Sequence, residues 1–271
     1  MPIHTKKGVM KMPVIQGLGW TFDTVSATYE KLRPGYVDAL YQQIFSYCPV
    51  NENSRAIEVG IGGGQATEPV LRTGCQVLAV EPGENFCRLC TEKFRAYPGF
   101  STLNGRFEEA ELPRESADLI FSATAFHWVP EEIGYRKVFD TLKSGGAFAR
   151  FANHPYNDKS RPGMHEAIQA VYDVYMPRPV KPTEYTEEKA IALAQIAEKY
   201  GFVDIQHHLY HRTRDFTADE YIQLLGTYSD HIAIEENTRR KFFGEIRDAI
   251  NGLGGVITIF DTIDLQLARK P

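Results

Sequence analysis

The sequence predicts an α/β fold built on one mostly parallel sheet with helices on both faces. Between residues 55 and 152, short apolar runs alternate with amphipathic segments of helical period. The apolar runs are continuous, which is typical of strands buried on both faces of a parallel sheet. The chain has 271 residues, of which 43% are hydrophobic. This suits one large domain, or one with an appended subdomain.

Each element between residues 55 and 152 has its own local signal. Strands are predicted at the apolar runs 55–60, 76–81, 100–105, 117–126 and 146–153. Helices are predicted at 65–74, 84–97 and 130–146. Gly74 closes the first helix, Pro130 stands near the start of the third, and Gly145-Gly146 ends it. These are the positions that glycine and proline favour at helix ends.

The regular alternation stops after residue 152. Five prolines lie between Asn153 and Pro182, around one helical run at 164–175. This predicts a helical insertion that forms a lid over the ligand edge of the sheet. The segments that follow are predicted to be a helix (186–201), a strand (202–216), two helices (218–229 and 235–250) and a strand (255–270). Since no further crossover fits, the last strand is predicted to be antiparallel, in a sheet of seven.

Composition limits the classes of function. The net charge of −5 and the pI near 5.9 argue against a general grip on nucleic-acid phosphates. No apolar run reaches the ~18 residues of a membrane span, and the N-terminus has no continuous apolar core of a signal peptide. We therefore expect a cytoplasmic protein without membrane or nucleic-acid partners. Its oligomeric state stays open.

Two groups of residues raise the question of a metal or redox site. Cys87 and Cys90 have CxxC spacing, but no second such pair completes a zinc set, and the pair falls inside a predicted helix. We interpret both as buried free thiols. His207 and His211 lie four residues apart in a predicted strand, about 13 Å, which is too far to share one ion. We predict no metal site.

The most informative stretch is EVGIGGGQAT, residues 58–67, with four glycines within five positions. A dinucleotide-binding turn needs G-x-G-x-x-G, and in either possible register the third glycine is missing. A Walker loop needs Gly-Lys-Ser/Thr, and no lysine is near. What remains is an acidic residue, Glu58, followed by Gly60, Gly62 and Gly64.

This pattern resembles motif I of the class I S-adenosylmethionine-dependent methyltransferases. With residues 22–36, the chain is similar to the broad group (methyltransferase type 11) that includes ubiquinone/menaquinone-biosynthesis and trans-aconitate methyltransferases. The resemblance covers residues 22–152 and extends weakly to the end. It implies a Rossmann-like fold and S-adenosyl-L-methionine as the cofactor.

The resemblance also implies which residues hold the cofactor. Glu58 orients the turn through its backbone amides. Glu81 ends the second strand, where a carboxylate can accept hydrogen bonds from a ribose diol. Phe107 and Glu108 stand at the adenine position, although Glu108 lies in a charged run that is more simply a solvated face. Ala123 ends the fourth strand, beside the methionine part of the cofactor.

Other residues are predicted near the methyl group. An N-terminal segment with Tyr29 and Arg33 folds across the cofactor in relatives. Arg33 is predicted to bind the methionine carboxylate, with a surface ion pair as the alternative. His127 and Trp128 follow the fourth strand at the ligand edge. His127 is the candidate general base and Trp128 an acceptor contact; the simpler alternatives are a structural histidine and a core tryptophan.

Two more catalytic candidates lie between the last strands. Tyr228 and His231 belong to a short polar stretch that returns toward the ligand edge in relatives, and at least one is predicted to face the acceptor. Asn153-His154-Pro155-Tyr156 is similar to the Asn-Pro-Pro-Tyr motif of DNA and glutamine N-methyltransferases. Because it follows strand five instead of strand four, we interpret it as the first turn of the lid.

The sequence therefore predicts a methyltransferase that acts on a small organic acceptor by direct in-line transfer. The alternatives are modification of tRNA or protein, and a module that binds the cofactor without catalysis. The predicted division is an N-terminal cofactor-covering segment (1–54), the cofactor-binding core (55–152), a lid-like insertion and helix (153–200), and C-terminal elements that complete the same sheet (201–271).

Overall fold

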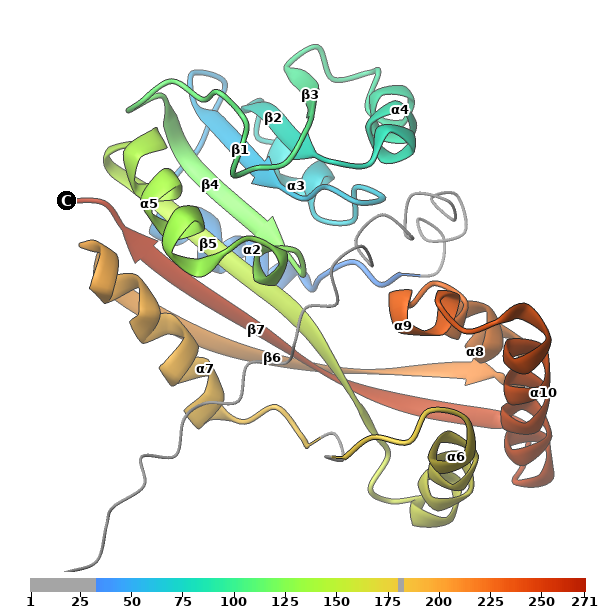
Figure 1. Ribbon diagram of the computed structural model, residues 1–271. Coiled ribbons are helices and arrows are strands. Elements are labelled where there is room, and N and C mark those ends of the chain that lie inside the picture. Colours follow the sequence, from blue (N-terminus) through green and yellow to red (C-terminus); the bar gives the residue numbers. More distant parts are fainter. Residues whose placement is uncertain (1–32, 180–182) are drawn as a thin grey trace, which may run out of the picture.

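The computed structural model describes residues 33–179 and 183–271, and within them seven strands form one sheet in the order β3-β2-β1-β4-β5-β7-β6 (Figure 1). The strands are β1 (Arg55–Val59), β2 (Gln76–Glu81), β3 (Phe100–Asn104), β4 (Ala117–Ala123), β5 (Leu142–Asn157), β6 (Val203–Thr217) and β7 (Val256–Arg269). Neighbours pair in parallel, except that β7 is antiparallel to both β5 and β6. The predicted seven-stranded sheet with one antiparallel strand is confirmed.

Helices cover both faces of the sheet. The helices described are α2 (Asp38–Tyr47), α3 (Thr67–Leu71), α4 (Glu84–Lys93), α5 (Glu131–Thr141), α6 (Pro162–Tyr175), α7 (Glu187–Ala194), α8 (Ala218–Leu225), α9 (Ser229–Ile232) and α10 (Glu236–Gly252), with 3₁₀ segments η2 (Phe126–Trp128) and η3 (Gln195–Tyr200). One core joins α2, α3 and α4 to the sheet through residues such as Ile44 and Val70. Val138 of α5 and Ala197 of η3 belong to a second core. The predicted α/β layering is thus observed.

The interpretation of Asn153–Tyr156 as the first turn of a lid is wrong. These residues continue β5, in register with β7 from Asn153 opposite Ile263 to Tyr156 opposite Phe260. Beyond Phe151, β5 no longer has β4 beside it, and a proline is tolerated in a strand with a single neighbour. The long strand β7 therefore extends the sheet past the point at which the sequence predicts an insertion.

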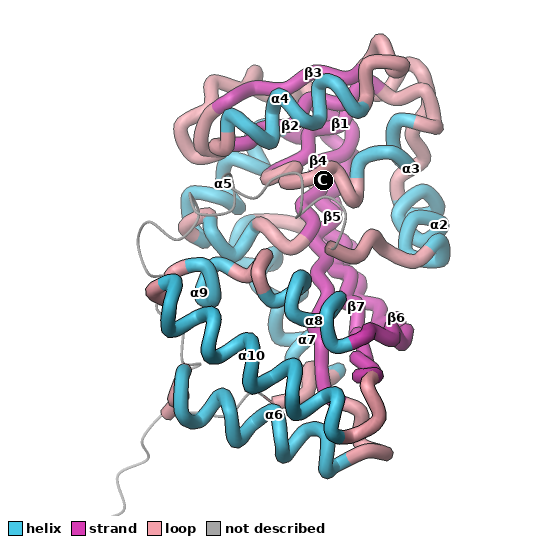
Figure 2. Tube along the Cα trace, turned by 90° about the vertical axis from the view of Figure 1, so that its right-hand side faces the viewer, coloured by secondary structure: helices cyan, strands magenta, loops and turns pink. Residues whose placement is uncertain are grey.

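The long antiparallel strands carry a separate group of helices. Figures 1 and 2 show α6, α8, α9 and α10 gathered at the end of the sheet where β6 ends and β7 begins. A third core, with Ile168 of α6, Ile222 of α8, Phe242 and Ile246 of α10, and Ile257 of β7, holds this group to the sheet.

The described residues test three expectations from the sequence. Cys87 and Cys90 are free thiols, 7% and 0% exposed, on α4, so the interpretation as buried thiols is confirmed. Across residues 33–179 and 183–271, no cluster of three or more histidine, cysteine or acidic side chains could hold a metal ion. None of the helices described in these ranges has the length and apolar character needed to cross a membrane.

Candidate functional site

The turn after β1 needs its glycines. Gly60, Gly62 and Gly64 have φ values of +75°, +51° and +72°, in the left-handed region that other residues seldom adopt. A Cβ on Gly60 would lie 2.5 Å from the Cβ of Ala125, just after β4. The turn therefore lies directly against the carboxyl end of β4.

Glu58 supports this turn from inside the protein. It is fully buried, and its Oε2 accepts a hydrogen bond from Thr67 Oγ1 at 2.7 Å. Its Oε1 is buried and has no hydrogen-bond partner in the part of the chain that the structure describes. Burial raises the pKa of Glu58 to about 8, with the charge of Glu81 adding to it and the Thr67 hydrogen bond opposing it. The predicted contact of Glu58 with backbone amides stays a prediction.

Glu81 connects two backbone turns at the end of β2. Its Oε2 accepts a hydrogen bond from the amide of Gly62 at 3.1 Å, and its Oε1 accepts one from the amide of Gly83 at 2.8 Å. These two contacts fix the position of the carboxylate at the end of β2. The ribose contact of Glu81 stays a prediction.

The end of β4 is a strained position that the sequence did not reveal. Thr124, which follows Ala123, has φ +54°, an uncommon conformation for a residue other than glycine. Its Oγ1 shares a hydrogen bond with Tyr36 Oη at 2.7 Å and accepts one from the amide of Asn153 at 3.4 Å. A single sequence gives no signal for such a φ angle. These contacts join the N-terminal segment, β4 and β5 at the ligand edge.

His127 and Trp128 lie in η2, with ring centroids 5.0 Å apart. Although His127 is exposed by surface area, protein surrounds it on most sides. This desolvation, with the charges of Arg150 and His154, lowers the pKa of His127 to about 4. The imidazole is therefore neutral at pH 7. The roles of His127 and Trp128 stay predictions.

His127 lines a cavity of about 150 Å³ that also holds a polar network missed by the sequence analysis. Asp264 of β7 lies 2.9 Å from His154 Nε2 and accepts hydrogen bonds from Tyr185 Oη, at 2.9 Å, and from Gln266 Nε2. Burial alone would raise the pKa of Asp264, but these hydrogen bonds hold it below its ordinary value. The network fixes the His154 ring, which stacks on Tyr185 with centroids 3.7 Å apart.

A second group of polar side chains, which we call the arginine cluster, lies on the face of the sheet opposite to the His154–Asp264 network. It consists of Asn153, Arg212, Arg214 and Asp261. Successive strand residues face opposite sides, so Asn153 and His154 diverge. Asp261 is 1% exposed; it accepts hydrogen bonds from Arg212 Nε at 3.0 Å and from Arg214 Nε and Nη2 at 2.6 and 2.9 Å. The alternation Arg-Thr-Arg in β6 was the available signal, because it places both arginines on one face.

The other predicted residues have clear surroundings. Tyr29 lies outside the described residues. Arg33 lies over the Tyr228 ring, 4.0 Å from its centroid, and its Nη2 donates a hydrogen bond to the Thr227 carbonyl at 3.0 Å. His231 is 4% exposed, with one ring nitrogen 2.8 Å from Tyr172 Oη. Its other ring nitrogen lies 2.6 Å from a carboxylate oxygen of the preceding aspartate. His231 thus holds the helical group together; catalytic roles for Tyr228 and His231 stay predictions.

Phe107 and Glu108 follow β3. Phe107 is 3% exposed and packs against Phe126, with ring centroids 6.5 Å apart. Glu108 pairs with Arg106 Nη1 at 3.3 Å. Phe107 is therefore a core residue of this loop, and the adenine contacts predicted for the pair stay predictions.

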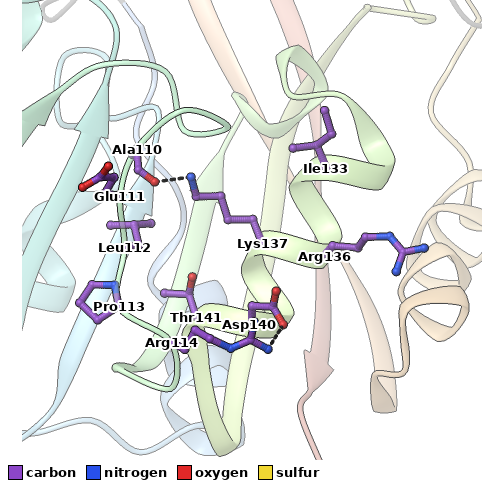
Figure 3. Close-up of a pocket in the computed structure, with 10 residues that line it drawn as sticks. All are labelled: Ala110, Glu111, Leu112, Pro113, Arg114, Ile133, Arg136, Lys137, Asp140 and Thr141. Atoms are coloured by element: carbon purple, nitrogen blue, oxygen red, sulfur yellow. Dashed lines mark hydrogen bonds and ion pairs between the residues drawn. The ribbon is translucent and has the colours of Figure 1, made fainter.

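A shallow hollow of about 800 Å³ lies between the loop after β3 and α5 (Figure 3). Figure 3 shows Lys137 reaching the Ala110 carbonyl and Arg114 paired with Asp140. None of the three glycines of the turn lines it. Because the hollow lies away from this turn, we do not assign the cofactor to it.

Comparisons with known proteins agree on one kind of protein. A family model described as a methyltransferase domain matches residues 57–149. An uncharacterised methyltransferase of Geobacillus thermodenitrificans is 30% identical over 149 residues, covering 51% of this chain and 67% of that protein. One of Schizosaccharomyces pombe is 24% identical over 234 residues, covering 86% and 88%. Trans-aconitate 2-methyltransferase of Rhizobium leguminosarum is 27% identical over 148 residues, 52% of each chain.

Solved structures show the same fold. The chain matches Haemonchus contortus phosphoethanolamine N-methyltransferase 2 in complex with S-adenosyl-L-methionine with a TM-score of 0.53. The match has 17% sequence identity and covers 92% of this chain and 57% of that one. At this identity the likeness concerns the fold alone.

Proposed function

Because the chain belongs to the S-adenosylmethionine-dependent methyltransferases, we propose that it methylates a small organic acceptor bound at the carboxyl ends of β4 and β5. The observation that carries this proposal is the chain of polar contacts from Thr124, at the end of β4, through Asn153 to Arg212. These side chains lie on the face of β5 that carries the arginine cluster. A small polar molecule fits such a site better than a nucleic acid does, because the chain is acidic overall.

The residues present fit the cofactor. S-adenosylmethionine carries an ammonium group and a ribose diol, which need acceptors, and it supplies an electrophilic methyl group on a sulfonium. Glu81 presents a carboxylate at the end of β2, and the fully buried Glu58 supports the turn from inside the protein. Three left-handed glycines form the tight turn between β1 and α3. We propose that these residues hold the cofactor, as the sequence predicts.

The chain's own residues then have to align the reacting groups. Direct displacement needs the nucleophile, the methyl carbon and the sulfur in line, and positioning supplies much of the barrier reduction. Thr124, held by Tyr36, fixes the edge at which the acceptor would lie. With its pKa lowered to about 4, His127 is a weak base at neutral pH. This favours an acceptor that needs little help in losing a proton, such as a carboxylate.

One relative supports a small organic acid. Trans-aconitate 2-methyltransferase acts, by its name, on a small organic acid. Modification of tRNA or protein remains the second candidate, and a non-catalytic module the third.

The test is to incubate the protein with S-adenosylmethionine labelled in the methyl group and with separate fractions of small metabolites, tRNA and protein. We expect label in the small-molecule fraction, in an amount that grows with enzyme concentration; a reaction without enzyme is the control. Label confined to tRNA or protein would overturn the proposed acceptor class. Binding of S-adenosylhomocysteine without label in any fraction would favour the non-catalytic module.

A further inference from the structure

The arginine cluster has more positive than negative charge. Arg212 and Arg214 both pair with the single carboxylate of Asp261. Arg33 lies over the ring of Tyr228, 4.0 Å from its centroid. Burial raises the pKa of Tyr228, and the charges of Arg33 and Arg214 both oppose this change. The cluster itself thus sets two guanidinium groups against one buried carboxylate.

The neighbouring acidic residue does not balance this charge. Asp230 also acts on Tyr228, but its carboxylate is already paired with Arg178 Nη2 at 2.8 Å and with His231 Nδ1 at 2.6 Å. Asp230 is thus already engaged by partners other than Arg212 and Arg214.

Both arginines of β6 retain an unused donor group. Arg212 donates through Nε to Asp261 and through Nη2 to Asn153 Oδ1, at 2.9 Å. Arg214 donates through Nε and Nη2, both to Asp261. Neither Nη1 group has a hydrogen-bond partner within the described part of the chain, and the side chains are only 21% and 17% exposed. Largely desolvated guanidinium groups with unused N–H donors are suited to an oxyanion.

The cluster is also in the right place. The side-chain oxygen of Asn153 accepts a hydrogen bond from Arg212, and its main-chain N–H donates one to Thr124 Oγ1, directly after β4. Two hydrogen bonds therefore link Arg212 to the strand end that lies against the glycine turn. An anionic group held by the arginines would place the rest of a small molecule toward that strand end.

We propose that Arg212 and Arg214 form an anion subsite that binds a carboxylate or phosphate group of the acceptor through their Nη1 groups. The subsite rests on the proposed function, since it names the chemical class of the acceptor. The acceptor is thus an organic acid or a phosphorylated small molecule, and a neutral analogue of the same size binds weakly.

The first experiment measures anion binding directly, by calorimetry on the protein saturated with S-adenosylhomocysteine. Succinate and inorganic phosphate are the probes, which separates a carboxylate subsite from a phosphate subsite. Arg212→Gln leaves Arg214 on both oxygens of Asp261, so the buried aspartate keeps a partner. We expect this variant to weaken binding of the preferred anion about tenfold or more, since one charged hydrogen-bond donor is lost. Arg240→Gln is the matched control, because Arg240 is 71% exposed on α10. It should bind anions as the wild type does.

A second variant keeps both arginines. Asn153→Asp places a carboxylate beside Arg212 with almost no change in shape, so it should abolish anion binding. The variant should still show a cooperative thermal unfolding transition, as a folded protein does. If the wild type, Arg212→Gln and Asn153→Asp all bind the preferred anion with the same affinity, the subsite is overturned. It is also overturned if the wild type binds neither succinate nor phosphate. The proposed function fails separately: if anions bind and the variants behave as expected, but no small molecule is methylated, the subsite stands and the acceptor reaction does not.

Discussion

Replacing Glu58 by glutamine should change how the stability of the protein depends on pH. Glu58 is fully buried, and its pKa is raised from 4.5 to about 8 in the folded protein. Between these values the unfolded chain has lost the Glu58 proton while the folded chain keeps it. The folded state then binds more protons, so its stability falls as pH rises from about 4.5 to 8.

The magnitude follows from the displaced pKa. A change from 4.5 to about 8 corresponds to at most about 5 kcal/mol of unfolding free energy, lost progressively across that interval. Glutamine has the shape of the neutral carboxyl and still offers an oxygen to Thr67 Oγ1, but it does not titrate. Relative to wild type, the variant should gain stability as pH rises and differ least near pH 4.5.

Urea denaturation of the ligand-free protein between pH 5 and 8.5 measures this difference. We expect the stability of Glu58→Gln minus that of wild type to grow by several kcal/mol over this range. Glu68→Gln, on the exposed side of α3, is the matched control and should leave the pH dependence unchanged. Parallel curves for wild type and Glu58→Gln would refute the reasoning that burial keeps this carboxyl protonated.

Three further predictions concern single residues. Gly60→Ala should lower the free energy of unfolding by about 2 kcal/mol or more, because its Cβ would lie 2.5 Å from that of Ala125 at a φ of +75°. Adding Ala125→Gly should recover part of this loss, whereas an unchanged denaturant midpoint for Gly60→Ala alone would contradict the close contact. With the pKa of His127 at about 4, kcat should show no inflection from this residue between pH 6 and 8; an inflection near 6.5 that disappears in His127→Gln would contradict the lowered value. His231→Ala should lower the free energy of unfolding by about 1–3 kcal/mol, because its buried hydrogen-bond partners are left unpaired. Tyr228→Phe should lower it less. Equal melting temperatures of wild type and His231→Ala would argue against the structural role of His231.

The sequence was most informative where structure depends on local signals. Continuous apolar runs predicted β1, β2 and β4, since strands buried on both faces have no polar alternation. The glycine spacing predicted the tight turn after β1, because glycine suits its left-handed backbone. In these cases the residue type and the conformation it adopts are linked directly.

The sequence was least informative where distant strands decide the structure. His154 sits beside a proline, which favours a turn, yet pairing with β7 keeps it in β5 and brings it to Asp264, 110 residues further on. The arginine cluster arises in the same way, from the register of β6 against β7. Thr124 adopts a left-handed backbone conformation that its sequence neighbours do not indicate. Each of these depends on tertiary pairing that overrides local preference.

The central claim is that the turn after β1, together with Glu81, holds the cofactor, and calorimetry with S-adenosylhomocysteine tests it most directly. Wild-type protein should bind one equivalent and should give no binding heat with NAD. Glu81→Ala, shown to be folded by its circular dichroism, should bind at least about tenfold more weakly, because hydrogen bonds to a charged acceptor are lost. Glu81→Gln, which keeps an oxygen for the amide of Gly62 or Gly83, should be weakened less. An unchanged dissociation constant in folded Glu81→Ala, or binding of NAD without binding of S-adenosylhomocysteine, would contradict the claim.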